Sequence, residues 1–288
     1  MELTVKGYAK INLALNILNK NSNNYHDLES IVFPLELHDS IEIKFNNKED
    51  DFITCDNYKV GDSKFNSCRK VIDILRNKYK FKEHFDIFIH KNIFIQSGLG
   101  GGSGDAAAVL FAILKILKIN LNTNELIDMF KPVGCDVPAA IFSKPCLVEG
   151  VGEKITSIEV NNNFFEYYVL LVKPKKGIST KEVYDKYDEL EKNHFDIRNI
   201  INELKKDSPE IKEKIGNSLE IAANNILPET VSLKNDLEKF GFDYVFMSGG
   251  GSTYVALSKN KKLIKSVFYK YYKDSKNYET ELTRFKQK

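Results

Sequence analysis

The chain opens with a regular alternation of apolar and polar residues, which is typical of a β-strand with one buried face. From Leu3 to Ile17 the apolar side chains occupy one face and the polar side chains the other. Lys10 and Asn12 are two positions apart and therefore share the polar face. The dipeptide His38-Asp39 predicts a turn before a further alternating strand.

The same patterns divide the rest of the chain into mixed strands and helices. Further strands are predicted at residues 41–45, 85–89, 93–95, 146–149, 155–160, 167–172, 244–247, 254–257 and 278–285. Helices are predicted from about residue 65 to 79, at 106–117 and 123–130, from 179 onward, across 196–240 and at 259–272. This mixture in both halves predicts an α+β protein of two domains. Asn161–Asn163 is the best boundary, which gives domains of residues 1–160 and 161–288.

Two helix ends are indicated by local chemistry. Ser179, followed three residues later by Glu182, is a capping box and predicts the start of a helix. Gly241 follows the last apolar residue of a helical pattern and is predicted to end that helix in a left-handed conformation.

Composition and charge limit the classes of function. Hydrophobic residues make up 42% of the 288 residues and charged residues 28%, as in soluble globular proteins. The net charge is only +2, and acidic and basic residues are interspersed along the chain. This charge pattern does not indicate binding to nucleic acid or to a membrane surface. No apolar run is long enough to span a bilayer and no targeting segment is visible, so we expect a cytoplasmic protein. The four cysteines lack close pairing, which favours reduced thiols over a zinc site.

A glycine-rich segment, residues 96–107, carries the clearest chemical signal in the chain. Five glycines and two serines in ten residues lead directly into a helical pattern. Such a loop leaves backbone N–H groups unblocked at the positive end of a helix dipole, which is how proteins bind phosphate. A flexible turn is the alternative. The segment lacks the Gly-Lys-Ser/Thr ending of a P-loop and does not open the first strand–helix unit, as a dinucleotide fingerprint would.

Several motifs together carry a resemblance to a known family. The glycine segment opening a helix resembles the phosphate loop of the GHMP kinase superfamily. More closely, the chain resembles the family of 4-diphosphocytidyl-2-C-methyl-D-erythritol kinases, from about residue 7 to about residue 257. The matching motifs are Ala9–Leu13, Tyr25–Ser30, Gly134–Pro138, Glu149–Glu153, Ser179-Thr180 with Tyr184, and Met247–Gly251. Tyr25-His26 after the Lys10 strand points to this family within the superfamily.

The resemblance implies a fold, a reaction and its cofactors. The fold would be the two-domain α+β fold of GHMP kinases, with the active site between the domains. The reaction would be ATP-dependent phosphorylation of the 2-hydroxyl of 4-diphosphocytidyl-2-C-methyl-D-erythritol, in non-mevalonate isoprenoid precursor biosynthesis, with ATP and Mg²⁺ as cofactors. The partner would be this small molecule, not nucleic acid or a membrane. Two alternatives remain: a small-alcohol kinase of the mevalonate type, and a nucleotide-binding regulator with impaired catalysis.

Lys10 and Asp136 are the implied catalytic residues. Phosphoryl transfer to an alcohol needs a group that takes up the hydroxyl proton, and Asp136 would be this base. Lys10 would keep Asp136 ionised and polarise the hydroxyl. From the residues alone, Asp136 is equally well explained as a helix N-cap, whereas Lys10 is better explained as a solvated strand lysine.

The remaining site residues bind the two substrates in this resemblance. Tyr25 and Tyr184 would sandwich the cytosine ring, His26 would hydrogen-bond its edge, and Asn12 would also contact the substrate. Both tyrosines have ordinary alternatives, as loop packing and as a helix core residue. The implied ATP-binding residues are Asn66, Phe94, Ile95, Gln96, Ser97, Gly98, Leu99, Gly100, Gly101, Gly102, Ser103 and Gly104. A second glycine turn, Ser248–Ser252, either borders the substrate phosphates or is simply a tight hairpin.

The sequence departs from the family pattern in the glycine segment. Phe94 stands where the family has proline, and Gln96 and Ser97 stand where glycines are usual. Gly104-Asp105 replaces the usual continuation and removes one hydroxyl near the phosphates. Either that loss is a true deficit, or Gly104 is needed for the backbone shape and Asp105 supplies an oxygen to the metal. An acidic side chain near a triphosphate would repel it unless it points away or helps to hold Mg²⁺. We favour the second interpretation, because the two changes are adjacent in the sequence and one can compensate for the other.

Overall fold

The computed structural model describes residues 2–22, 25–57 and 66–287. The chain forms two compact units that each consist of several segments. Unit 1 comprises Met1–Lys10, Leu37–Ile93 and Gly100–Ser143, and unit 2 comprises Ile11–Glu36, Phe94–Leu99 and Lys144–Lys288. Two long strands, β1 (Glu2–Lys20) and β2 (His26–Asn46), contribute residues to both units. The predicted division near residue 160 stays a prediction about domains.

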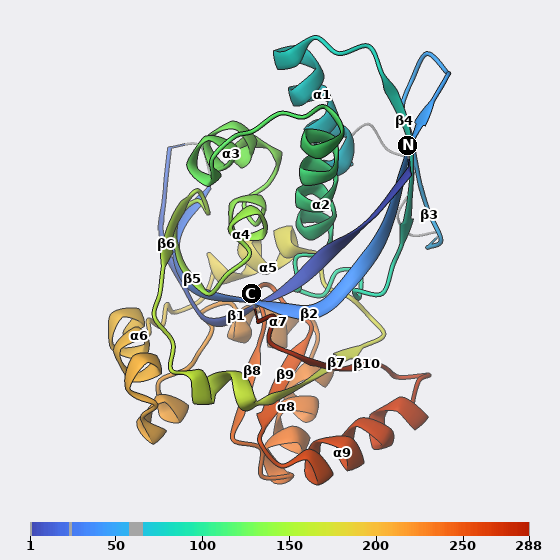
Figure 1. Ribbon diagram of the computed structural model, residues 1–288. Helices are drawn as coiled ribbons and strands as arrows, with labels where there is room; N and C mark the ends of the chain where they lie inside the picture. Colours follow the sequence, from blue (N-terminus) through green and yellow to red (C-terminus); the bar gives the residue numbers. More distant parts are fainter. Residues whose placement is uncertain (1, 23–24, 58–65, 288) are drawn as a thin grey trace. The chain divides into compact units, whose positions relative to one another are not determined.

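Unit 1 combines part of a sheet with a layer of helices. The second half of β2 pairs antiparallel with β4 (His84–His90), and β4 pairs parallel with β3 (Phe52–Cys55). The helices are α1 (Ser67–Tyr79), α2 (Gly101–Ile116), α3 (Thr123–Phe130) and α4 (Val137–Phe142), with a short 3₁₀ helix at Lys131–Val133. Figure 1 shows α1 and α2 side by side, and α2 also packs against α4. The buried face of α1 is the predicted apolar stripe, which includes Val71, Ile72 and Leu75.

Unit 2 is built around a four-stranded antiparallel sheet in the order β10-β7-β9-β8. These strands are β7 (Tyr168–Pro174), β8 (Tyr244–Met247), β9 (Tyr254–Ser258) and β10 (Tyr278–Arg284). The helices are α5 (Thr180–Tyr187), α6 (Ile197–Lys206), α7 (Glu220–Ile226), α8 (Glu229–Lys239) and α9 (Lys261–Lys273). The first half of β2 pairs with β5 (Cys146–Gly150), which pairs with β6 (Lys154–Ser157). Short 3₁₀ helices lie at Asn162–Glu166 and Pro209–Glu213.

Most predicted elements are confirmed, and their local chemistry is as expected. The Ser179/Glu182 capping box opens α5, and Gly241 has a φ of +78° directly after the end of α8. The helical patterns predicted across 196–240 are confirmed, and they form α6, a 3₁₀ helix, α7 and α8. The first break follows Asp207, which ends α6 in a left-handed conformation.

The predicted turn at His38-Asp39 is wrong, as is the predicted strand at 93–95. β2 continues through Asp39, whose side chain is fully buried and accepts hydrogen bonds from the backbone N–H groups of Asn92 (2.6 Å) and Ile93 (2.8 Å). Because Asp39 is satisfied in this way, it is accommodated inside a strand. The same bonds take the amide of Ile93 out of any strand ladder. None of the helices in the described ranges is long and apolar enough to cross a membrane.

Candidate active site

The glycine segment changes from loop to helix at Gly100, which has a φ of +68° and precedes the first turn of α2. A Cβ on Gly100 would lie 2.9 Å from the side-chain carbons Cγ and Cε of Lys10, so Lys10 fills the space beside this glycine. Gly98 also has a positive φ, and a Cβ there would collide with the carbonyl oxygen of Ser248. Gly102 differs, because a Cβ built on it meets nothing within 4 Å. The start of α2 therefore has open space at Gly102 that a bound phosphate can use.

Gly104 is a structural glycine. A Cβ on Gly104 would approach the carbonyl oxygen of Tyr8 closer than 3.0 Å, and would lie 3.1 Å from the carbonyl carbon of Tyr8. On the other side of the same contact, a Cβ on Gly7 would lie 2.6 Å from Oδ1 of Asp105. Strand β1 and the start of α2 thus approach backbone to backbone through two glycines. This supports the interpretation that Gly104 is needed for backbone shape.

Asp105 belongs to a buried cluster that we call the Lys91 cluster: Lys91, Asp39 and Asp105. Nζ of Lys91 lies 2.8 Å from Oδ2 of Asp105 and also contacts a carboxylate oxygen of Asp39, and all three side chains are buried. Burial raises the pKa of the Asp105 carboxyl to about 7, although the charge of Lys91 opposes this shift. The carboxylate is thus engaged by Lys91 inside the protein, and our preference for Asp105 as a source of oxygen for the metal loses its support.

Lys10 and Asp136 are brought together, as the sequence predicts. Nζ of Lys10 lies 3.3 Å from Oδ1 of Asp136, and the two side chains are 11% and 44% exposed. Asp136 occupies the N-cap position of α4, but its side chain makes no capping hydrogen bond to the helix. The carboxylate is therefore paired at one oxygen and open to solvent. Lys10 thus pairs with this carboxylate through Nζ, while its aliphatic chain occupies the space beside Gly100.

In unit 2, Asn12 lies in a hydrogen-bonded network with the second glycine turn. Nδ2 of Asn12 donates to Oγ of Ser30 at 2.8 Å, and its backbone N–H donates to Oγ of Ser248 at 3.2 Å. Oγ of Ser248 donates in turn to the carbonyl oxygen of Gly98 at 3.1 Å. Asn217, which the sequence analysis missed, donates to the carbonyl oxygens of Met247 and Gly249 and so shapes the turn. The turn at Ser248 is thus hydrogen-bonded to the glycine segment, and its position beside the substrate phosphates stays a prediction.

The residues predicted to bind cytosine also lie in unit 2. The rings of His26 and Tyr184 have centroids 5.2 Å apart and are tilted by 36°. His26 is buried, whereas Tyr25 beside it is 59% exposed. Nε2 of His26 lies 2.6 Å from Oδ1 of Asp188, which sequence reasoning did not find. The signal that could have found Asp188 is its position four residues after Tyr184, where successive turns of a helix bring side chains onto one face.

Asn66 has a structural role that the sequence did not separate from binding. Its side chain accepts a hydrogen bond from the backbone N–H of Cys68 and caps α1. Its proposed contact with the adenine side of ATP stays a prediction. Residues 58–65, where the predicted start of this helix falls, lie outside the described residues.

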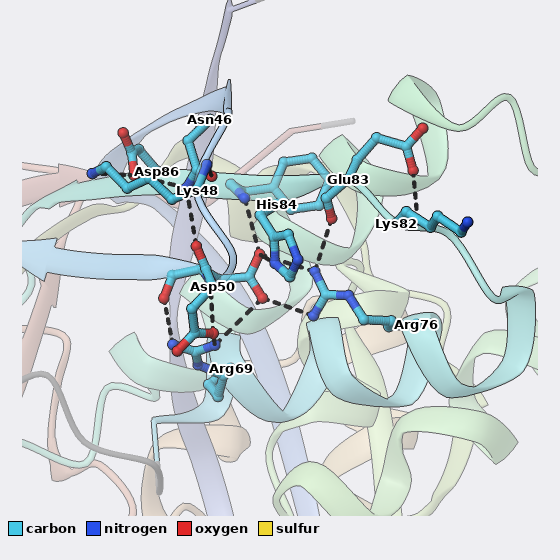
Figure 2. Close-up of polar contacts among 11 residues, drawn as sticks. Asn46, Lys48, Asp50, Arg69, Arg76, Lys82, Glu83, His84 and Asp86 are labelled. Carbon is cyan, nitrogen blue, oxygen red and sulfur yellow. Dashed lines mark hydrogen bonds and ion pairs between the residues drawn. The ribbon is translucent and has the colours of Figure 1, made fainter.

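A second group of charged residues in unit 1 has the spacing of a metal site, namely Asp50, Asp51 and His84. Figure 2 shows the side chains of Arg69 and Arg76 directed toward this group. The buried carboxylate of Asp51 receives both guanidinium groups, from Arg76 at 2.7 Å and from Arg69 at 3.4 Å. Two cations already neutralise this carboxylate, so the group is a structural ion-pair network and not a cation site.

Comparison with known proteins first identifies the fold of the chain. The family model described as "GHMP kinases N terminal domain" matches residues 66–144, which include α2 and Asp136. Among solved structures, a 4-(cytidine 5'-diphospho)-2C-methyl-D-erythritol kinase has a TM-score of 0.79 at 20% identity, with both chains fully covered. A homoserine kinase from Cytophaga hutchinsonii has a TM-score of 0.75 at 15% identity and covers 99% of this chain and 94% of its own. The fold is therefore that of the GHMP kinases, as predicted.

Curated relatives narrow the class. A 4-diphosphocytidyl-2-C-methyl-D-erythritol kinase of Clostridium tetani is 35% identical over 253 residues, which cover 87% of this chain and 89% of the relative. The protein of the same name from Lachnoclostridium phytofermentans is 33% identical over 286 residues, covering 98% and 97%. The chain belongs to the family of 4-diphosphocytidyl-2-C-methyl-D-erythritol kinases.

Proposed function

We propose that this protein transfers the γ-phosphoryl group of ATP to the 2-hydroxyl of 4-diphosphocytidyl-2-C-methyl-D-erythritol, as a step of non-mevalonate isoprenoid biosynthesis. Family membership supports the reaction class. The observation that carries the proposal is the ion pair of Lys10 with Asp136, at 3.3 Å, formed by a lysine whose aliphatic chain fills the space beside Gly100. The proposed proton acceptor and its cation therefore belong to the same neighbourhood as the start of α2. A cytoplasmic location is part of the proposal.

Asp136 acts as the general base in this proposal. It takes the proton of the substrate hydroxyl as the oxygen bonds to the γ-phosphorus, while the bond from that phosphorus to the bridging oxygen of ADP breaks. Lys10 pairs with the carboxylate at 3.3 Å and offsets negative charge that develops on the transferred group. Backbone N–H groups of residues 100–102 at the start of α2 bind the ATP phosphates.

Mg²⁺ neutralises phosphate charge in such a transfer, and the residues present fit a metal that binds mainly through ATP. Asp105 is engaged by Lys91, whereas Asp136 has an accessible carboxylate oxygen and Ser103 offers a hydroxyl on the first turn of α2. Mg²⁺ usually keeps several waters and takes much of its coordination from substrate phosphates. Because Asp136 serves as the base, we propose that the ATP phosphates and the Ser103 hydroxyl would hold the metal.

The cytidine group of the substrate binds at Tyr25, His26 and Tyr184 in this proposal, with Asn12 as a further contact. The exposed ring of Tyr25 and the ring of Tyr184 offer flat surfaces for stacking on a base. Mevalonate and homoserine carry no base, so a kinase for either has no use for these three side chains together.

Release of ADP in the presence of each candidate alcohol tests the function. We expect turnover with the cytidine substrate and none above background with mevalonate or homoserine at equal concentrations. Turnover with mevalonate instead would refute the substrate assignment. Binding of ATP without product from any of the three alcohols would identify a nucleotide-binding regulator.

A further inference from the structure

His26 is held by a charged pair from two other elements of unit 2. Its Nε2 atom lies 2.6 Å from Oδ1 of Asp188, the residue that follows α5. The other oxygen of Asp188 accepts a hydrogen bond from Nζ of Lys20, at the end of β1, also at 2.6 Å. Only 5% of the His26 side chain is exposed. The imidazole is therefore fixed in orientation by a carboxylate that is itself fixed by a lysine.

This arrangement determines which ring nitrogen of His26 carries a proton. The pKa of the Asp188 carboxyl lies below its usual range, because hydrogen bonds from Lys20 and His26 outweigh the opposing effect of partial burial. An ionised carboxylate only accepts hydrogen bonds, so Nε2 of His26 must be the donor. In the neutral imidazole the other nitrogen, Nδ1, then has no proton and is an acceptor.

An acceptor at the base site discriminates between pyrimidines. Cytosine carries an amino group at position 4, which donates hydrogen bonds, whereas uracil carries a carbonyl oxygen there, which only accepts. A neutral His26 with a protonated Nε2 can accept a hydrogen bond from the amino group through Nδ1. Opposite the carbonyl of uracil, the same lone pair would meet another lone pair and lose that bond.

We propose that Asp188, oriented by Lys20, is a specificity-determining positioning residue that makes His26 an acceptor and so selects cytosine over uracil. This inference rests on the proposed function, in which His26 addresses the base of the substrate. Asp188 itself acts through His26 and needs no contact with the substrate.

The variant Asp188→Asn tests the proposal with almost no change of shape. A carboxamide can accept through its oxygen or donate through its NH₂ group, so it permits either tautomer of His26. We expect the ratio of kcat/KM for the cytidine substrate to that for its uridine counterpart to fall about tenfold, the scale of one hydrogen bond. The KM for ATP should not change. Asp185→Asn, an exposed position on the same helix, is the matched control and should leave the ratio unchanged.

A second measurement needs no variant and no turnover. Nitrogen-15 shifts of the His26 ring in the wild-type protein report its tautomer directly, at about pH 8.5, which is roughly two units above the ordinary pKa of a histidine. A proton on Nε2 is the expected result, and a proton on Nδ1 overturns the proposal. If Asp188→Asn does not fold, two measurements on the wild-type protein test the proposal instead. They are this spectrum and the ratio of the affinities for CMP and UMP.

The outcomes separate this inference from the proposed function. If the wild type does not phosphorylate the cytidine substrate, the proposed function fails, and the preference for CMP over UMP still tests the base site. If turnover is present but Asp188→Asn keeps the wild-type ratio of cytidine to uridine, Asp188 does not set specificity. A lower ratio together with protonated Nε2 in the wild type supports the proposal.

Discussion

Substitution of Gly104 by serine should destabilise the protein, although it would restore the hydroxyl that the family pattern has at this position. The Cβ that the substitution adds would be forced against the backbone carbonyl of Tyr8 at less than 3.0 Å, whereas ordinary contact begins at 3.4 Å. The atoms in the way belong to the backbone of β1 and cannot rotate aside. The start of α2 and strand β1 would have to separate.

The expected cost follows from the nature of this contact. Adding atoms to a well-packed interior typically costs about 1–3 kcal/mol, and a collision with backbone belongs at the upper end. A loss of about 3 kcal/mol lowers the melting temperature of a chain of this size by roughly 6–12 °C. Gly7→Ala addresses the same contact from the other strand, where its Cβ would lie 2.9 Å from the backbone nitrogen of Asp105, and it should cost a similar amount.

Urea unfolding and ATP titration of two variants test this reasoning. Gly102→Ala is the matched control, because its Cβ meets no protein atom within 4 Å. Replacing a glycine by alanine at a compatible position stabilises by about 0.4–1 kcal/mol, so this variant should fold at least as well as the wild type. It should nonetheless bind ATP more weakly, since the methyl group takes space that we assign to phosphate. A Gly104→Ser protein within about 0.5 kcal/mol of wild type, or one with higher turnover, would refute the argument.

Three further predictions concern the catalytic pair, the base site and the Lys91 cluster. Asp136→Asn should retain ATP binding and lose about two to four orders of magnitude in turnover, the contribution of a general base, and Lys10→Ala should act in the same direction; activity above a tenth of wild type would remove Asp136 from this role. Tyr25→Ala and Tyr184→Ala should each weaken binding of the cytidine substrate by about 1–3 kcal/mol with the KM for ATP unchanged, as measured by steady-state kinetics; equal loss for both substrates would indicate a structural role. Because the folded-state pKa of Asp105 is raised to about 7, the folded protein binds more protons than the unfolded chain between about pH 4 and pH 7, so the free energy of unfolding should fall as the pH rises through this range. Asp105→Asn should remove that decrease in urea titrations at several pH values, and identical pH profiles for variant and wild type would contradict it.

Local patterns predict most of the elements, and they fail where a distant partner decides. Asp39 has the local pattern of a turn residue, because nothing near it in sequence can satisfy a buried carboxylate. Its partners Lys91, Asn92 and Ile93 lie more than fifty positions away and make the strand possible. The preference of a residue type for a turn or a strand predicts local structure only weakly, and tertiary contacts override it.

The candidate site likewise contains residues that the sequence identifies and residues whose role depends on a distant partner. Lys10 and Asp136 could be chosen from chemistry and motif, and their ion pair agrees with that choice. Asp188 has only its spacing from Tyr184 as a sequence signal, because its importance comes from a hydrogen bond to His26 across 162 positions of the chain. The cluster around Asp105 was likewise invisible, since the sequence shows that an acid follows the glycine segment but not which way its carboxylate points.

The segments that make up the two units also determine when each unit can fold during synthesis. Every segment of unit 1 exists once the ribosome has passed Ser143, whereas unit 2 needs residues of 144–288. Residues 11–36 therefore wait for partners that are made, at about 5–20 residues per second, many seconds later. In that interval apolar side chains such as Leu15 and Ile17, which the finished protein buries, face the solvent.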